Sequence, residues 1–141
     1  MPGDVDQLYP GLDPTSLPRE LIERLPRHKD DIERVESLVE IGYPDNAAAL
    51  PYLAQWLQDA NWPVARPVAS YFARLGWALL PVVRTVLRGD DEAWAYWMLV
   101  LVVDELDDDL VRELEADIAP WATAGGGEGV DEVAEALLAR I

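Results

Sequence analysis

Apolar residues recur along most of this chain with the spacing of one face of an α-helix. In one example Ile32, Val35, Leu38 and Val39 follow one another at intervals that place them on a single side of a helix. No stretch alternates apolar and polar residues cleanly, and the chain has no Asn-Gly or Asp-Gly hairpin turn. The pattern therefore predicts an all-α protein.

Glycine and acidic residues mark where these helices begin and end. Gly42, Gly76 and Gly89 each follow an apolar periodic stretch, and glycine readily adopts the conformation that ends a helix. Polar residues before the stretches can accept hydrogen bonds from the first free N–H groups. The candidate caps are Asp30 or Asp31, Asn61, Asp90 or Asp91, and Asp107 to Asp109. The predicted helices cover residues 31–41, 45–58, 62–75, 77–88, 91–106, 108–121 and 131–141.

Proline divides the chain into a leader and a helical remainder. Residues 1–18 hold four prolines, each of which lacks a backbone donor and disfavours a helix before it, so we expect an extended leader. Residues 19–141 are predicted to form a single helical-repeat domain, with a Gly-rich break at 125–129 before the last helix. Pro51 and Pro67 lie inside helical windows, where we expect kinks.

The predicted helix starts recur in pairs about every 31 residues, a period typical of helical-hairpin solenoids. The segment 93–103 is apolar on all sides, so the helix that contains it must be covered on several sides. An interior position in a stack of antiparallel helix pairs supplies that cover. We therefore expect a short right-handed superhelix of three HEAT-like antiparallel helix pairs plus a C-terminal helix.

Composition excludes several kinds of chemistry. The chain has 141 residues, no Cys and one His, so Cys-ligated zinc, a thiolate nucleophile and a His cluster are all excluded within it. A formal net charge of −16 would repel nucleic acid over most of the surface. The longest apolar run is too short to span a bilayer. We expect a cytoplasmic protein without cofactor, metal, membrane or nucleic-acid partner, and the oligomeric state stays open.

The charge is unevenly distributed along the chain. Net charge is −7 over residues 1–59, +4 over residues 60–89 and −13 over residues 90–141. The four basic residues of the middle segment are Arg66, Arg74, Arg84 and Arg88. One interpretation pairs them with acids of the same chain, such as Asp59, Asp104 or Glu105. The other makes them a fork for an external carboxylate, phosphate or acidic peptide, because guanidinium geometry suits those groups.

The chain has six tryptophans, more than a core of this size requires. Core packing explains them in one interpretation. In the other, some of them line a concave groove together with arginines and anchor a peptide. The residues of this predicted binding groove are Trp62, Arg66, Arg74, Trp94, Trp97, Asn61 and Asp59.

Several strings in the middle of the chain are characteristic of a known family. They are Leu25 to Glu33, Gly42-Tyr43-Pro44, Trp56 to Ala65, and Gly89 to Trp97. From Leu25 to about Leu106 the chain resembles a bacterial family named only as domain of unknown function 5071. The resemblance implies a compact HEAT-like helical domain and no established activity.

Two functions from different classes follow from these observations. The first is a non-catalytic protein-interaction module that binds a basic protein through its acidic surface, as an inhibitor or immunity-type protein does. The second is a small-anion-binding protein or a hydrolase that uses His28 with Asp30 or Asp31. We expect the first, with no catalytic residue, because Asp residues directly before a helix ordinarily act as caps.

Overall fold

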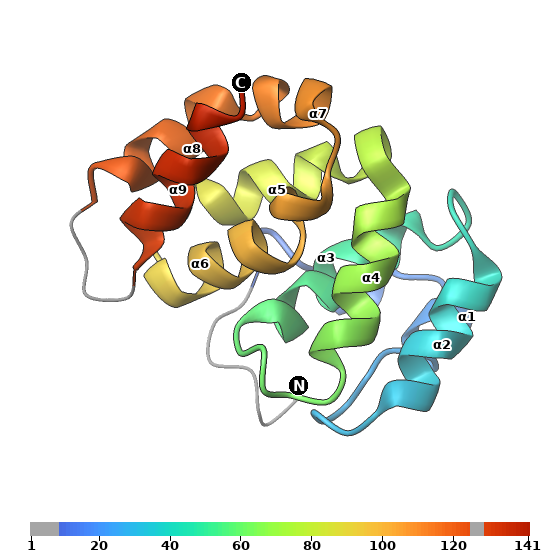
Figure 1. The fold of residues 1–141 in the computed structure, drawn as a ribbon. Helices are drawn as coiled ribbons and strands as arrows, with labels where there is room; N and C mark the ends of the chain where they lie inside the picture. The colour runs from blue at the N-terminus through green and yellow to red at the C-terminus, as the bar shows by residue number, and fades with distance from the viewer. Residues whose placement is uncertain (1–8, 125–128) are drawn as a thin grey trace. The chain divides into compact units, whose positions relative to one another are not determined.

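The computed structural model describes residues 9–124 and 129–141, and the regular structure in these ranges is entirely helical (Figure 1). The predicted all-α class is therefore confirmed. The chain divides into two compact units, Met1–Tyr71 and Phe72–Ile141, each with its own core. Within the described ranges, no helix is long and apolar enough to cross a membrane.

The first unit is built mainly from short helices. Its elements are the 3₁₀ turn η1 (Pro14–Ser16), α1 (Arg19–Ile22), α2 (Ile32–Ile41), η2 (Ala47–Ala49), α3 (Leu50–Ala54), η3 (Gln55–Leu57) and most of α4 (Ala65–Leu75). The apolar stripe of α2 points inward, because Val35 and Leu38 are fully buried. Leu53, Trp56 and Leu57 from the α3–η3 region are buried in the core of the same unit.

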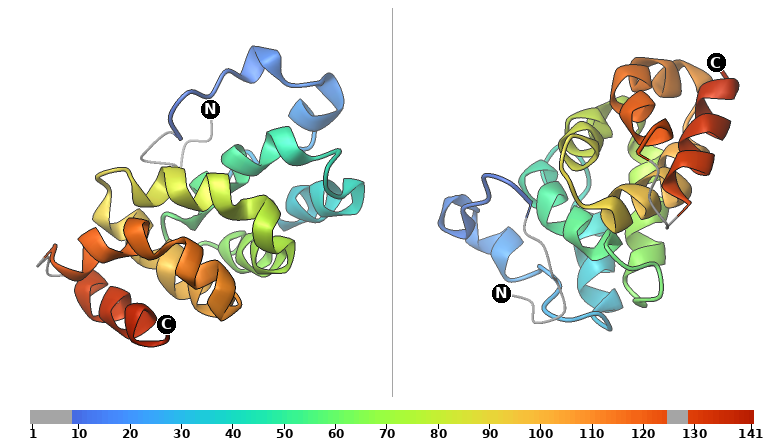
Figure 2. Two further views of the ribbon diagram at one scale, coloured as in Figure 1. Left: turned by 90° about the horizontal axis from the view of Figure 1, so that it is seen from above. Right: turned by 90° about the vertical axis from the view of Figure 1, so that its left-hand side faces the viewer.

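The second unit contains the longer apolar helices. Its elements are η4 (Gly76–Leu79), α5 (Leu80–Leu87), α6 (Glu92–Leu101), η5 (Val103–Glu105), α7 (Asp108–Glu113), α8 (Glu115–Ala122) and α9 (Val130–Ala139). Helix α9 lies beside α8 and also packs on α6 and α7 (Figure 2). Helix α5 covers another part of α6. This double cover explains how Ala95, Met98 and Leu99 are completely buried, as the apolar sequence of α6 requires.

Several predicted helix ends are confirmed. The Asp91 carboxylate accepts a hydrogen bond from the Trp94 N–H at 2.9 Å, so Asp91 caps α6. Gly42 follows α2 with a φ of 80°, a conformation that favours glycine. The Asn61 cap is wrong, because α4 begins four residues later at Ala65 and the Asn61 N–H instead donates to Asp59. A local turn, in which the Trp62 N–H donates to the Asp59 carbonyl at 3.2 Å, thus precedes the helix.

The expected kinks at Pro51 and Pro67 are wrong. Pro51 occupies the first turn of α3, and Pro67 is the third residue of α4. Backbone N–H groups in a first turn have no partner within the helix, so proline is accommodated there without a bend. Pro120, in contrast, lies beyond the first turn of its helix, α8.

The leader and the Gly-rich break are described only in part. Residues 1–8 of the leader and residues 125–128 of the break lie outside the described residues. Within the rest of the leader, the Tyr9 N–H donates to the Gln55 side chain at 2.9 Å and Leu17 is buried. The division into leader and repeat domain, like the right-handed superhelix, stays a prediction.

Candidate functional site

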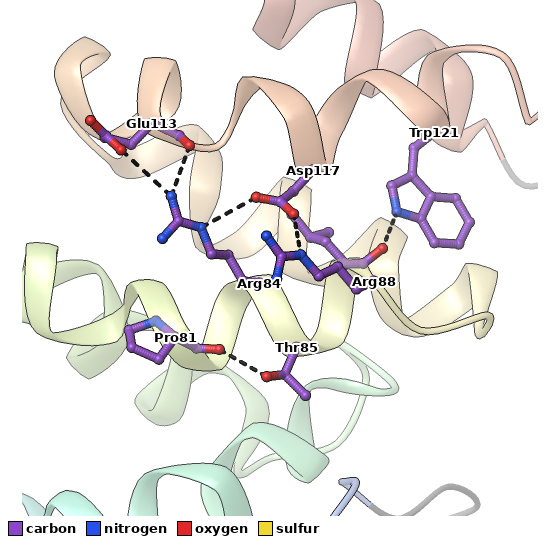
Figure 3. Close-up of polar contacts among 8 residues, drawn as sticks. Pro81, Arg84, Thr85, Arg88, Glu113, Asp117 and Trp121 are labelled. Atoms are coloured by element: carbon purple, nitrogen blue, oxygen red, sulfur yellow. Dashed lines mark hydrogen bonds and ion pairs between the residues drawn. The ribbon is translucent and has the colours of Figure 1, made fainter.

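Arg84 of α5 and Arg88, which directly follows this helix, bind one carboxylate of α8 inside the second unit (Figure 3). Arg84 and Arg88 are four residues apart, the spacing of side chains on one helix face. Arg84 Nε lies 3.3 Å from Asp117 Oδ2, and Arg88 Nε lies 2.7 Å from Asp117 Oδ1. Both oxygens of Asp117 are therefore engaged by guanidinium groups.

The burial of Asp117 explains why two arginines bind its carboxylate. Its side chain is only 5% exposed, whereas those of Arg84 and Arg88 are 33% and 68% exposed. A carboxylate withdrawn from water needs opposite charge and hydrogen bonds to replace its hydration. Arg84 is held further by Glu113, whose main-chain carbonyl accepts a hydrogen bond from Arg84 Nη2 at 3.1 Å. The Glu113 carboxylate lies 3.5 Å from the same nitrogen.

An indole completes the contact between α5 and α8. Trp121 Nε1 donates a hydrogen bond to the Leu87 carbonyl at 2.8 Å. Leu87 is the last residue of α5, where carbonyl groups lack a partner within the helix. The bond therefore satisfies one such carbonyl and fixes the orientation of the Trp121 ring.

An open pocket of about 550 Å³ lies next to this cluster. Its lining residues are Leu87, Arg88, Gly89, Ala116, Asp117, Pro120, Trp121 and Ala124. Most of this lining is apolar, and Arg88 is its one cationic side chain. The second unit thus offers an apolar pocket with a guanidinium group at its edge.

The structure favours internal pairing for Arg84 and Arg88. Their partners are Glu113 and Asp117, rather than the suggested Asp59, Asp104 or Glu105. Sequence reasoning missed Asp117 because the pair is brought together across about thirty residues of chain. The sequence nevertheless held an indication that Asp117 is buried, because it immediately precedes Ile118, a buried residue on the apolar side of α8.

Four residues of the predicted groove belong to the first unit. The Asp59 carboxylate accepts the Asn61 N–H at 2.8 Å. Trp62 contacts Trp56 edge to face, with ring centroids 5.6 Å apart. Arg66 is exposed and forms no ion pair with any residue in the described ranges.

The other three groove residues belong to the second unit. Trp94 is 5% exposed and is therefore a core residue of α6. Trp97 is half-buried and contacts Tyr96 edge to face, with centroids 4.8 Å apart. Arg74 is exposed. A groove formed by all seven residues stays a prediction, and so do their roles in binding.

His28 and Asp31, the pair suggested for hydrolysis, are in contact before α2. His28 Nε2 lies 3.0 Å from Asp31 Oδ1, and Asp31 Oδ2 accepts the backbone N–H groups of Arg27 and His28. Burial raises the pKa of Asp31, but these hydrogen bonds and the nearby His28 and Arg34 hold it below its ordinary value. Asp30 is exposed. Across the residues that the structure describes, no group of three or more side chains could hold a metal ion.

Most of the arginines of the second unit form ion pairs with carboxylates. Arg140 pairs with Asp108 at 2.9 Å and with Asp104 at 3.5 Å, and Arg112 pairs with Asp109 at 3.1 Å. Other acidic side chains of this unit are exposed and form no ion pair within the described ranges. They are Asp90, Glu105, Asp107, Glu115, Glu132 and Glu135.

The second unit has an exposed aromatic residue in η4, next to a glycine that approaches α7. Trp77 in η4 is 58% exposed, the most exposed of the large apolar residues described. Its neighbour Gly76 approaches α7, because a Cβ atom at Gly76 would lie 3.8 Å from Leu110 Cδ1. Asp107 to Asp109 begin α7 and are all exposed. Sequence reasoning did not select Trp77 for the predicted groove.

Comparison with known proteins gives one match. The family described as "Domain of unknown function (DUF5071)" matches residues 24–137, which is most of the chain and reaches beyond the segment on which the resemblance rested. No curated protein matches the chain.

Proposed function

The chain belongs to the DUF5071 family, and from this premise we propose that it is a non-catalytic protein-interaction module that binds a basic protein partner. The acidic surface of the second unit would form the interface. An inhibitor or immunity-type protein that acts in the cytoplasm is one form of this function.

The observation that carries the proposal is the imbalance left after internal pairing. The second unit has five arginines and fifteen acidic residues. Arg84, Arg88, Arg112 and Arg140 all bind carboxylates of their own unit. Most of the positive charge is thus neutralised locally, and exposed carboxylates remain to attract a basic surface and raise its association rate.

Trp77 supports the proposal independently of charge. Tryptophan is enriched among the few interface residues that contribute most of the binding free energy, because its large ring becomes desolvated in a partner's pocket. Trp77 is exposed and lies on the element that approaches the start of α7. An exposed aromatic anchor in a unit with many exposed carboxylates matches a partner with an apolar pocket surrounded by Lys and Arg.

The proposal is tested by affinity capture with the immobilised full chain from the cytosol of its source cells. We expect basic proteins to be captured at 50 mM NaCl and released at 500 mM NaCl, because salt screens exposed charges. Trp77→Ala and the double variant Glu105→Gln/Asp107→Asn should each reduce the capture.

The matched control neutralises two exposed acids of the first unit, in the double variant Glu36→Gln/Glu40→Gln. It changes the net charge by the same amount and should leave the capture unchanged. If the control reduces capture as much as the other double variant does, the second unit is not the interface. If no basic protein is captured at low salt, the proposed function is wrong.

A further inference from the structure

We propose that the pocket beside Arg88 binds a small apolar carboxylate. The pocket volume of about 550 Å³ lies within the range of roughly 300–1,000 Å³ that is typical of small-molecule sites. Its walls include Leu87, Ala116, Pro120 and the Trp121 ring. Walls of this kind accommodate an aliphatic chain or an aromatic ring and gain stability from excluding water.

The polar groups of the pocket determine the charge of the ligand. Both oxygens of Asp117 already accept hydrogen bonds from arginines, and Trp121 Nε1 already donates to Leu87. Arg88 uses its Nε atom for Asp117, and no hydrogen bond joins its two Nη atoms to the described residues. Arg88, which lines the pocket, therefore keeps unused donors on its cation. A carboxylate supplies the two acceptors that this edge of a guanidinium group fits.

The neighbouring residues hold Arg88 ready for such a ligand. Asp117 fixes the Nε side of the guanidinium group at 2.7 Å, and Arg84 in turn fixes Asp117 at 3.3 Å. Arg88 nevertheless remains 68% exposed. A side chain that is already ordered loses less conformational entropy when it binds, so this arrangement increases affinity. Asp117 is thus a positioning residue for the site.

The experiment is isothermal titration calorimetry of the full chain at 150 mM NaCl with three probes of equal chain length. The probes are sodium octanoate, 1-octanol and octylamine. We expect octanoate to bind with one-to-one stoichiometry and about tenfold or more tighter than octanol, because only the carboxylate pairs with Arg88. Octylamine should bind most weakly. Equal affinities for octanoate and octanol, or no octanoate binding at millimolar concentration, would overturn the proposal.

Two variants locate the binding site. Arg88→Gln removes the cation and should weaken octanoate binding about tenfold while leaving octanol binding unchanged. Ala116→Leu extends a side chain from an exposed lining position of α8 into the pocket and should abolish binding of both ligands.

The matched control is Arg112→Gln, which removes an exposed arginine of the same unit away from the pocket. It should leave the octanoate affinity within about twofold. Circular dichroism checks that each variant is folded. If Arg88→Gln does not fold, Ala116→Leu still tests the proposal. Octanoate binding that is unchanged in a folded Ala116→Leu would show that octanoate occupies another place and would overturn the proposal.

Discussion

The Nε atom of Arg88 lies 2.7 Å from the Oδ1 atom of Asp117, although 29 residues separate them in the chain. This contact involves one of the four arginines of the basic middle segment, residues 60–89, and Arg84 is a second that binds the same carboxylate. The guanidinium groups of Arg84 and Arg88 neutralise a buried carboxylate of the same unit. The strongly acidic character of the remaining surface therefore persists in the folded protein.

Asp117→Asn tests the contribution of this cluster to stability. The variant keeps the size of the side chain but removes the charge that two arginines bind. We expect the free energy of unfolding to fall by roughly 1.5–3 kcal/mol, the usual range for hydrogen bonds that involve a charged group. Urea unfolding, followed by circular dichroism, measures the change.

Asp109→Asn is the control for this prediction. Asp109 also pairs with an arginine, but its side chain is 83% exposed. Exposed ion pairs contribute little because water screens them, so we expect a loss of less than about 1 kcal/mol. If the two variants lose the same free energy of unfolding, burial does not make the ion pairs of Asp117 more stabilising than the exposed pair of Asp109.

Asp91→Ala tests the start of α6. The substitution removes the carboxylate that accepts the Trp94 N–H at 2.9 Å, so one N–H group of the first turn loses its partner. We expect a loss of about 1 kcal/mol in urea unfolding, as for other helix caps. Asp90→Ala is the control, because Asp90 is exposed and does not cap the helix. A larger loss for Asp90→Ala would contradict this assignment.

The pKa of Asp31 leads to a prediction for the acid range. Because the folded-state pKa lies below the ordinary value of 3.8, the carboxylate stabilises the fold above that pH. This contribution is lost as the pH falls through the folded-state pKa. The difference in unfolding free energy between the wild type and Asp31→Asn should therefore be constant near neutral pH and shrink below 3.8.

NMR titration of the Asp31 carboxyl carbon provides the direct measurement. Its midpoint should lie below 3.8. A midpoint at or above that value would mean that the N–H groups of Arg27 and His28 do not hold the carboxylate as the structure shows.

Helix periodicity predicted the all-α class. Apolar spacing and glycine located α2 well, since Val35 and Leu38 of its apolar stripe are buried and Gly42 ends it. Local hydrogen bonds were harder to predict. Asn61 is a common type of cap, but it lies in a turn after Asp59, and α4 begins only at Ala65. Where α4 begins depends on the path of the chain after this turn, and apolar periodicity does not determine that path.

The candidate sites were less predictable for a related reason. The pairing of Arg88 with Asp117 depends on how α5 and α8 pack, and no short-range pattern indicates that packing. Trp77 was not among the residues selected from the sequence. In the structure it lies in η4 and is 58% exposed. Charge distribution along the chain still identified the acidic surface, because net charge needs no knowledge of packing.

The central claim is that the second unit binds a basic protein through Trp77 and the exposed carboxylates of the same unit. Isothermal titration calorimetry with a basic protein obtained by affinity capture tests it most directly. We expect Trp77→Ala to weaken binding by about 2 kcal/mol, as for other aromatic anchors, while Glu36→Gln/Glu40→Gln has no effect. Raising NaCl from 50 to 500 mM should weaken the wild type further. An affinity that changes neither with Trp77→Ala nor with salt would contradict the claim.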